Sequence, residues 1–101
     1  MKIQIIGADL KINKRIKKLI QEKIAIGLEK HLQNFGKDIK TATVKIYKRT
    51  RWGYRVNFDM RLPGKENIFA KASHRYLPSA IIQLREKIER QIKKYKTQLK
   101  S

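Results

Sequence analysis

Apolar residues recur at two different spacings along the chain, and these spacings divide it into helices and strands. Residues 13–32 and 78–101 place isoleucine and leucine every three or four positions, which is the period of an amphipathic helix. Other segments alternate apolar and polar residues as one-sided strands do, namely residues 2–6, 41–47, 54–62 and 68–72. The pattern therefore predicts the element order β-α-β-β-β-α.

Polar and turn-forming residues mark the ends of these elements. Asn13 is expected to cap the first helix, and Pro78 is expected to occupy the first position of the last helix. Turns or breaks are predicted at Gly7-Ala8-Asp9, Asn34-Phe35-Gly36, Arg51-Trp52-Gly53 and Pro63-Gly64. Ile26 and Gly27 do not fit the apolar stripe of the first helix, so an irregular turn is expected there.

The loops between the last three strands are short, which predicts antiparallel neighbours. Each strand has a single apolar face, so both helices should cover that face and leave the other exposed to water. The expected fold class is α+β, with two helices packed on one face of a four-stranded sheet, similar to double-stranded-RNA-binding domains. Residues 1–101 are expected to form one domain.

The charge balance narrows the possible partners. The chain has 26 Lys and Arg but 8 Asp and Glu, a net charge of +18. So many positive charges repel one another within the domain unless an anionic partner neutralises them. This favours nucleic acid as the partner, with an anionic membrane as the second choice. The absence of cysteine excludes disulfides, and His31 and His74 lack neighbouring ligands for a metal.

Several function classes find no support in the residues. No Gly-rich phosphate loop and no Ser, His and acid grouping is present, so we expect neither an enzyme nor a cofactor or small-molecule substrate. The N-terminus does not read as a signal peptide, and no run of 18 apolar residues predicts a membrane span. These observations predict a cytoplasmic location.

The last helix concentrates its cations on one flank. Lys87, Arg90 and Lys94 lie together beside the apolar stripe with no acid among them, whereas the opposite flank mixes both signs. An acid-free ridge suits phosphate binding, because each neutralised phosphate releases counterions. The alternative is a solvated helix face without a partner.

Further cations lie on the first helix, on the sheet and at a hairpin tip. The first helix contributes Arg15, Lys17, Lys23 and Lys30, and the tip contributes Arg49 and Arg51 beside Trp52. Trp52 either stacks on a base or packs on the hairpin, and Tyr47, Tyr54 and Phe69 carry the same two alternatives. The exposed sheet face is expected to show one acid, Asp59, among the following residues: Lys2, Gln4, Lys45, Arg55, Arg61 and Lys71.

Four stretches resemble the ribosome hibernation promoting factor family, also called ribosome-associated inhibitor A or sigma-54 modulation protein. They are the opening Met-x-Ile-x-Ile-x-Gly, Leu62-Pro63-Gly64, the run from Ile68 to Ala72, and the run from Lys87 to Lys96. The last run, which begins Lys-Ile-Glu-Arg-Gln-Ile, is the most specific of the four. The resemblance covers essentially the whole chain. The β-α-β-β-β-α order is also that of the family.

The resemblance implies a mechanism and a partner. Family members bind the small ribosomal subunit and its rRNA at the decoding region, where they exclude messenger and transfer RNA and silence the ribosome. The family's basic positions fall on Lys87, Arg90 and Lys94 in the last helix and on Lys17 and Lys23 in the first. The chain resembles the short form of the family, without the ribosome-dimerising domain, and is expected to be monomeric off the ribosome.

The chain departs from the family pattern in several respects, among them a higher net charge and Ser73, His74 and Arg75 in place of acids before the last helix. Tyr76-Leu77-Pro78 stands at the start of the last helix, where the family has an Asp cap and a Tyr, and one extra residue is expected around Ile26-Gly27. Two other functions stay open. One is a general double-stranded-RNA-binding or structural ribosomal protein, and the other is a membrane-surface protein with a basic amphipathic helix.

Overall fold

The computed structural model describes the backbone of residues 2–8, 10–32, 41–49, 51, 53–61 and 67–100, and the side chains from residue 3 to residue 95 within these ranges except 30–32 and 41. The helices and strands follow the predicted order. They are β1 (Lys2–Ala8), α1 (Lys14–Ile20), a π-helical segment η1 (Gln21–Ile26), α2 (Gly27–Leu32), β2 (Thr41–Arg49), β3 (Gly53–Arg61), β4 (Asn67–His74) and α3 (Leu77–Lys100). Because α1, η1 and α2 are continuous in sequence, they form one helical run.

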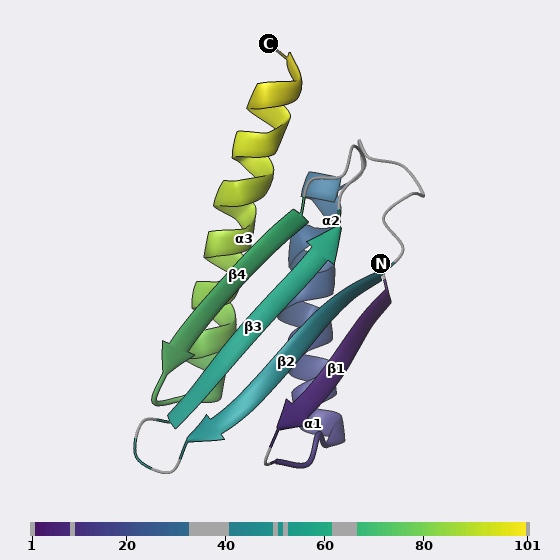
Figure 1. Ribbon diagram of the computed structural model, residues 1–101. Coiled ribbons are helices and arrows are strands. Elements are labelled where there is room, and N and C mark those ends of the chain that lie inside the picture. Colours follow the sequence, from purple (N-terminus) through teal and green to yellow (C-terminus); the bar gives the residue numbers. More distant parts are fainter. Residues whose placement is uncertain are drawn as a thin grey trace.

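The four strands form one mixed sheet in the order β1-β2-β3-β4 (Figure 1). The pairs β2–β3 and β3–β4 are antiparallel, as their short connections predict. β1 is parallel to β2, with Ile5 opposite Val44. Parallel neighbours need a crossover connection, and the first helical run belongs to that connection.

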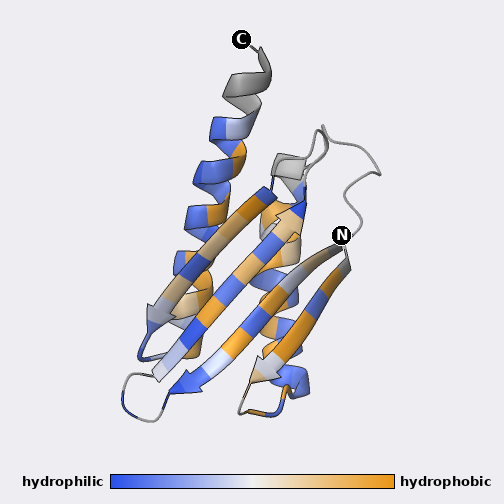
Figure 2. Ribbon diagram, in the orientation of Figure 1, coloured by the Kyte–Doolittle hydropathy of each residue, from blue (hydrophilic) through white to orange (hydrophobic). Residues whose placement is uncertain are grey.

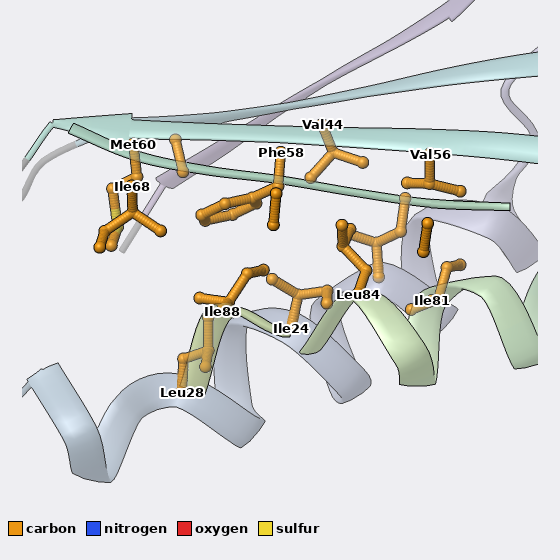
Figure 3. Packing of buried hydrophobic residues seen from close by; sticks show 14 of the residues in the cluster. Ile24, Leu28, Val44, Val56, Phe58, Met60, Ile68, Ile81, Leu84 and Ile88 are labelled. Carbon is orange, nitrogen blue, oxygen red and sulfur yellow. The ribbon is translucent and has the colours of Figure 1, made fainter. Parts of the chain in front are cut away.

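Both helical runs lie on the same face of the sheet, which confirms the predicted α+β architecture (Figure 3). Val44, Val56 and Phe58 point from the sheet toward Ile24, Leu84, Ile88 and their neighbours, and all have no exposed surface. No polar or charged side chain is buried within the part of the chain that the structure describes. The colours alternate between apolar and polar along β2 and β3 (Figure 2), and burial alternates along β3 and β4, so the second face of the sheet remains open.

The irregular turn expected in the first helix is the π-helical segment η1. Ile20, Ile24 and Leu28 are buried, as the apolar stripe requires, and Ala25 is buried as well. Ile26 is 59% exposed, which explains why it did not fit the stripe. A wider π turn accommodates an additional residue within a helix without breaking it, consistent with the extra residue expected here.

The ends of the strands differ from the sequence-based expectation. Gly7 and Ala8 were expected to end the first strand, but both pair with β2, opposite Ile46 and Tyr47. A side chain at Gly7 would lie 2.5 Å from the carbonyl oxygen of Leu10, so glycine lets the next segment pass close to the strand. β2 and β4 are each longer than predicted, because backbone pairing continues past the apolar alternation.

The helix starts are nearly as predicted. Asn13 caps α1, since its Oδ1 accepts the backbone N–H of Ile16 at 2.9 Å. α3 begins at Leu77, one residue before the position expected from Pro78. The Tyr76 carbonyl accepts the N–H of Ala80, and the Tyr76 N–H donates to Nδ1 of His74 at 3.0 Å. The expected turns at 34–36 and 63–64, and the side chain of Trp52, lie outside the described residues.

Gly53 provides a test of the β2–β3 turn. Its φ is 88°, and an added Cβ would lie 2.5 Å from the His74 carbonyl oxygen and from Cα of Arg75. We expect Gly53→Ala to lower the free energy of unfolding by about 1–3 kcal/mol in urea titration, because left-handed backbone and a backbone clash both oppose the side chain. Gly27→Ala is the matched control. Its Cβ meets only the flexible Arg85 side chain, at 3.0 Å from Cδ, so helix propensity should make it neutral or stabilising by up to about 1 kcal/mol. Equal losses at both glycines would contradict this account.

Candidate nucleic-acid interface

The predicted basic flank of α3 is present in the structure. Lys87, Arg90 and Lys94, here called the α3 ridge, are all exposed, and the apolar stripe beside them is buried. The ridge spans eight residues of helix, from 87 to 94, which is about 10 Å along the axis. The opposite flank pairs its charges, since Arg85 Nε lies 3.4 Å from Oε1 of Glu89. The α3 ridge therefore presents three exposed cations to solvent, and its neighbouring acid by helical geometry is Glu86, one turn before Arg90.

The same flank contacts the outer edge of β4. Gln91 donates from Nε2 to the carbonyl oxygen of Phe69 at 2.7 Å and accepts the Phe69 N–H at Oε1 at 3.3 Å. One turn earlier, Lys87 Nζ donates to the carbonyl oxygen of Lys71 at 2.7 Å. These bonds satisfy backbone groups that an edge strand would otherwise leave open to pairing with another chain.

Lys87 therefore differs from the other two ridge residues. Its ammonium group has three donors, and one of them is engaged with the Lys71 carbonyl. Arg90 and Lys94 lie farther toward the solvent side of the helix by helical geometry. A substitution at Lys87 would change the sheet edge as well as the charge, whereas changes at Arg90 and Lys94 would change the charge alone.

The α3 ridge does not face the first helical run. The flank that does so carries Arg85, whose Cδ would lie 3.0 Å from a side chain at Gly27. α2 and η1 contact α3 on this side. The ridge is thus turned toward the β4 edge, and the structure does not gather the cations of both helices into one groove.

The remaining predicted positions occupy other parts of the surface. Arg15 and Lys17 are exposed on α1, and Lys23 is half-buried on η1. Arg49 and Arg51 are exposed at the β2–β3 hairpin, which lies at the end of the sheet where α1 begins (Figure 1). The side chain of Lys30 lies outside the described residues. The predicted positions whose side chains are described therefore lie in three places, namely on α3, along α1 and η1, and at the hairpin, and their role stays a prediction.

The open face of the sheet carries a second basic surface, which confirms the placement of the described residues predicted for it. Lys45, Arg61, Lys71 and Asp59 are exposed, and Arg55 is half-buried. Tyr47 lies among these cations, with Lys45 Nζ 5.3 Å and Arg55 Cζ 5.4 Å from its ring centroid. The sequence left open whether Tyr47 packs or stacks. The structure places it outside the core, because its strand neighbours Val44 and Ile46 take the core positions.

The described part of the chain holds no cluster of three His, Asp or Glu side chains that would bind a metal ion. None of its helices is both long enough and apolar enough to cross a membrane.

Comparisons with known proteins agree on the fold. The sequence profile of the family described as sigma 54 modulation protein / S30EA ribosomal protein matches residues 3–100. A ribosomal subunit interface protein from Coxiella burnetii is similar in structure, with a TM-score of 0.71 and 24% identity over 96% of this chain and 99% of its own. The N-terminal domain of Protein Y from Thermus thermophilus has a TM-score of 0.74 and 23% identity over 94% of this chain and 99% of its own. No curated protein matches the chain by sequence at a significant level.

The contact between Gln91 and β4 gives a prediction for the sheet edge. Gln91→Ala removes both hydrogen bonds to Phe69, so we expect faster amide hydrogen exchange at Phe69 and a loss of about 1 kcal/mol in the free energy of unfolding. Gln83→Ala is the control, because Gln83 is exposed on the same flank and the change in helix propensity is identical. We expect less than about 0.5 kcal/mol for the control. Unchanged amide hydrogen exchange at Phe69 in the Gln91 variant would show that the two Gln91 hydrogen bonds do not protect the edge of β4.

Proposed function

Since the chain belongs to the family of sigma 54 modulation proteins and S30EA ribosomal proteins, we propose that it is a ribosome hibernation factor that inhibits translation under stress or stasis. It binds the small ribosomal subunit near the decoding region and blocks the binding of messenger and transfer RNA. The family match over residues 3–100 carries this proposal. A structural neighbour that is itself named a ribosomal subunit interface protein supports a position between the subunits.

In this proposal the predicted basic side chains bind phosphates of rRNA. The α3 ridge supplies Arg90 and Lys94 as exposed cations and Lys87 as a cation already oriented by the Lys71 carbonyl. The other predicted positions bind neighbouring rRNA, and they are Arg15, Lys17, Lys23, Lys30, Arg49 and Arg51. Phosphate contacts fix the orientation of a protein on RNA, while shape complementarity selects the site.

In the proposed mechanism the protein acts by occupying its site on the ribosome, and it catalyses no reaction. The family is ribosome-associated, which implies action in the cytoplasm. The chain acts as a single ribosome-binding domain and, away from the ribosome, as a monomer, because a net charge of +18 opposes association of its copies. No catalytic residue, cofactor or small-molecule substrate enters the mechanism.

Cell-free translation tests the proposed activity. We expect the protein in excess over ribosomes to inhibit protein synthesis, because it occupies the site that messenger and transfer RNA need. Raising the transfer RNA concentration should restore synthesis, and ribosomes that already hold both RNAs should resist. Full synthesis at a saturating protein concentration would contradict the proposal and favour a structural or general RNA-binding role.

The α3 ridge is tested with two pairs of matched variants. Arg90→Gln/Lys94→Gln removes two cations from the ridge without touching the Lys87 contact to β4. Arg75→Gln/Lys11→Gln removes one Arg and one Lys, both exposed, from loops outside the nine predicted positions. We expect the ridge pair to weaken small-subunit binding at least about tenfold and to reduce the salt slope by roughly one unit per lost phosphate contact. For both pairs, the free energy of unfolding should differ from that of the unmodified protein by at most about 0.5 kcal/mol per substituted position.

Binding to purified small subunits, measured by sedimentation at several salt concentrations, separates the two pairs. If the loop pair weakens binding as much as the ridge pair, the ridge belongs to a diffuse positive surface and holds no specific contact.

A further inference from the structure

The open face of the sheet holds two aromatic residues that the core does not use. Tyr47 on β2 and Phe69 on β4 both lie at positions that alternate with buried residues, so their rings stand on the open face. In the sheet register, Tyr47 lies in the row of Arg55 and Ser73, and Phe69 lies in the row of Asp59 and Thr43. The two aromatic positions are therefore two strands and four residues apart, about 16 Å.

Each aromatic position is accompanied by cations. Lys45 Nζ and Arg55 Cζ lie 5.3 and 5.4 Å from the centroid of the Tyr47 ring. Phe69 is 52% exposed, and Lys71 follows two residues later on the same face of β4. Tyr47 is half-buried and Phe69 is exposed. A ring that keeps accessible surface beside cations offers stacking area and phosphate binding at the same place.

The backbone under Phe69 is held in place. Gln91 binds both its N–H and its carbonyl oxygen, and Lys87 binds the carbonyl oxygen of Lys71. An exposed phenylalanine on an edge strand would otherwise sit on a backbone free to pair or fray. The ring is thus presented from a fixed position, which lowers the entropy cost of binding.

A row of polar side chains crosses the face between the two rings. It runs from Lys45 through Asn57 to Lys71, and Asn57 accepts a hydrogen bond from Arg55 Nε at 3.4 Å. Among the described side chains of the open face, Asp59 is the one acid, and the cations are Lys45, Arg49, Arg55, Arg61 and Lys71. This charge imbalance selects an anionic partner with a repeating charge.

We infer that the open face is a second binding surface, and that it binds a single-stranded stretch of RNA. Bases stack on Tyr47 and Phe69, and the phosphates between them lie against the row from Lys45 to Lys71. A duplex does not fit this arrangement, because its bases are already stacked inside the helix and do not reach side-chain rings. An acidic peptide matches the cations but brings no bases to stack on the two rings.

The open face and the α3 ridge belong to different layers of the fold, and they adjoin at the β4 edge, where Lys87 donates to the carbonyl oxygen of Lys71. The ridge belongs to the helical layer, and the open face is on the other side of the sheet (Figure 1). This inference does not depend on the proposed function, because an isolated oligonucleotide contains no ribosome and tests the open face by itself.

The test uses the full chain and a fluorescein-labelled single-stranded RNA of about eight nucleotides, long enough to span both rings. Tyr47→Leu and Phe69→Leu keep the net charge and much of the apolar bulk but remove the ring faces. We expect each variant to lose about five- to tenfold in affinity, with an unchanged salt slope, because stacking is lost and no cation is removed. In NMR spectra of the unmodified protein, RNA should shift the ring signals of Tyr47 and Phe69 upfield.

Tyr76→Leu is the matched control, since Tyr76 is 63% exposed but lies in the turn before α3 and not on the sheet. It should bind the oligonucleotide as the unmodified protein does, and all three variants should keep the same circular dichroism spectrum. The inference is overturned if Tyr47→Leu and Phe69→Leu bind as tightly as the unmodified protein, or if Tyr76→Leu loses as much. It is also overturned if a labelled poly-glutamate peptide binds as tightly as the RNA and is equally weakened by the two variants.

Discussion

Phe58 has no exposed surface, and the two layers of the fold meet around it. It lies on β3, opposite Val44 on β2 and Ala70 on β4, and the helices approach it from one side through residues such as Ile24 and Ile88 (Figure 3). Because every strand turns most of its apolar side chains to this side, both helical runs must pack there to remove them from water. The cations are excluded from this layer, and they occupy the outer surfaces of the helices and the open face of the sheet.

The sequence was sufficient to predict the order of the elements, since periods of 3.6 and 2 are direct consequences of helix and strand geometry. The sequence also located the irregularity of the first helix near Ile26-Gly27, but it did not predict that the irregularity is a π-helical segment. An extra residue can be absorbed by a loop, a kink or a π turn, and the choice depends on which side chains the sheet and α3 can bury. Here η1 buries Ile24 and Ala25 and leaves Ile26 outside, a result of tertiary packing.

The candidate site, too, could be predicted from the sequence only in part. The position of Lys87, Arg90 and Lys94 on one flank follows from helical angles alone, so it could be predicted. Which element lies beside that flank could not be, and the bonds from Lys87 and Gln91 to β4 were therefore missed. The alternation of β2 indicated that Tyr47 is on the open face, but the Arg55 beside its ring depends on the register between β2 and β3.

The β4 edge and the net charge act together on how copies of the chain meet. Lys87 and Gln91 occupy backbone groups through which two edge strands would pair, and +18 charges repel a second copy before it arrives. The same repulsion acts within one molecule and lowers the stability of the folded state. An anionic partner that binds only the native fold relieves it, so binding and stability are linked. RNA that encloses both the helical side and the open face would relieve the repulsion on both sides of the sheet. A flat RNA surface would relieve the repulsion on one side of the sheet. The distribution of cations over both layers therefore favours a binding site into which the protein is inserted.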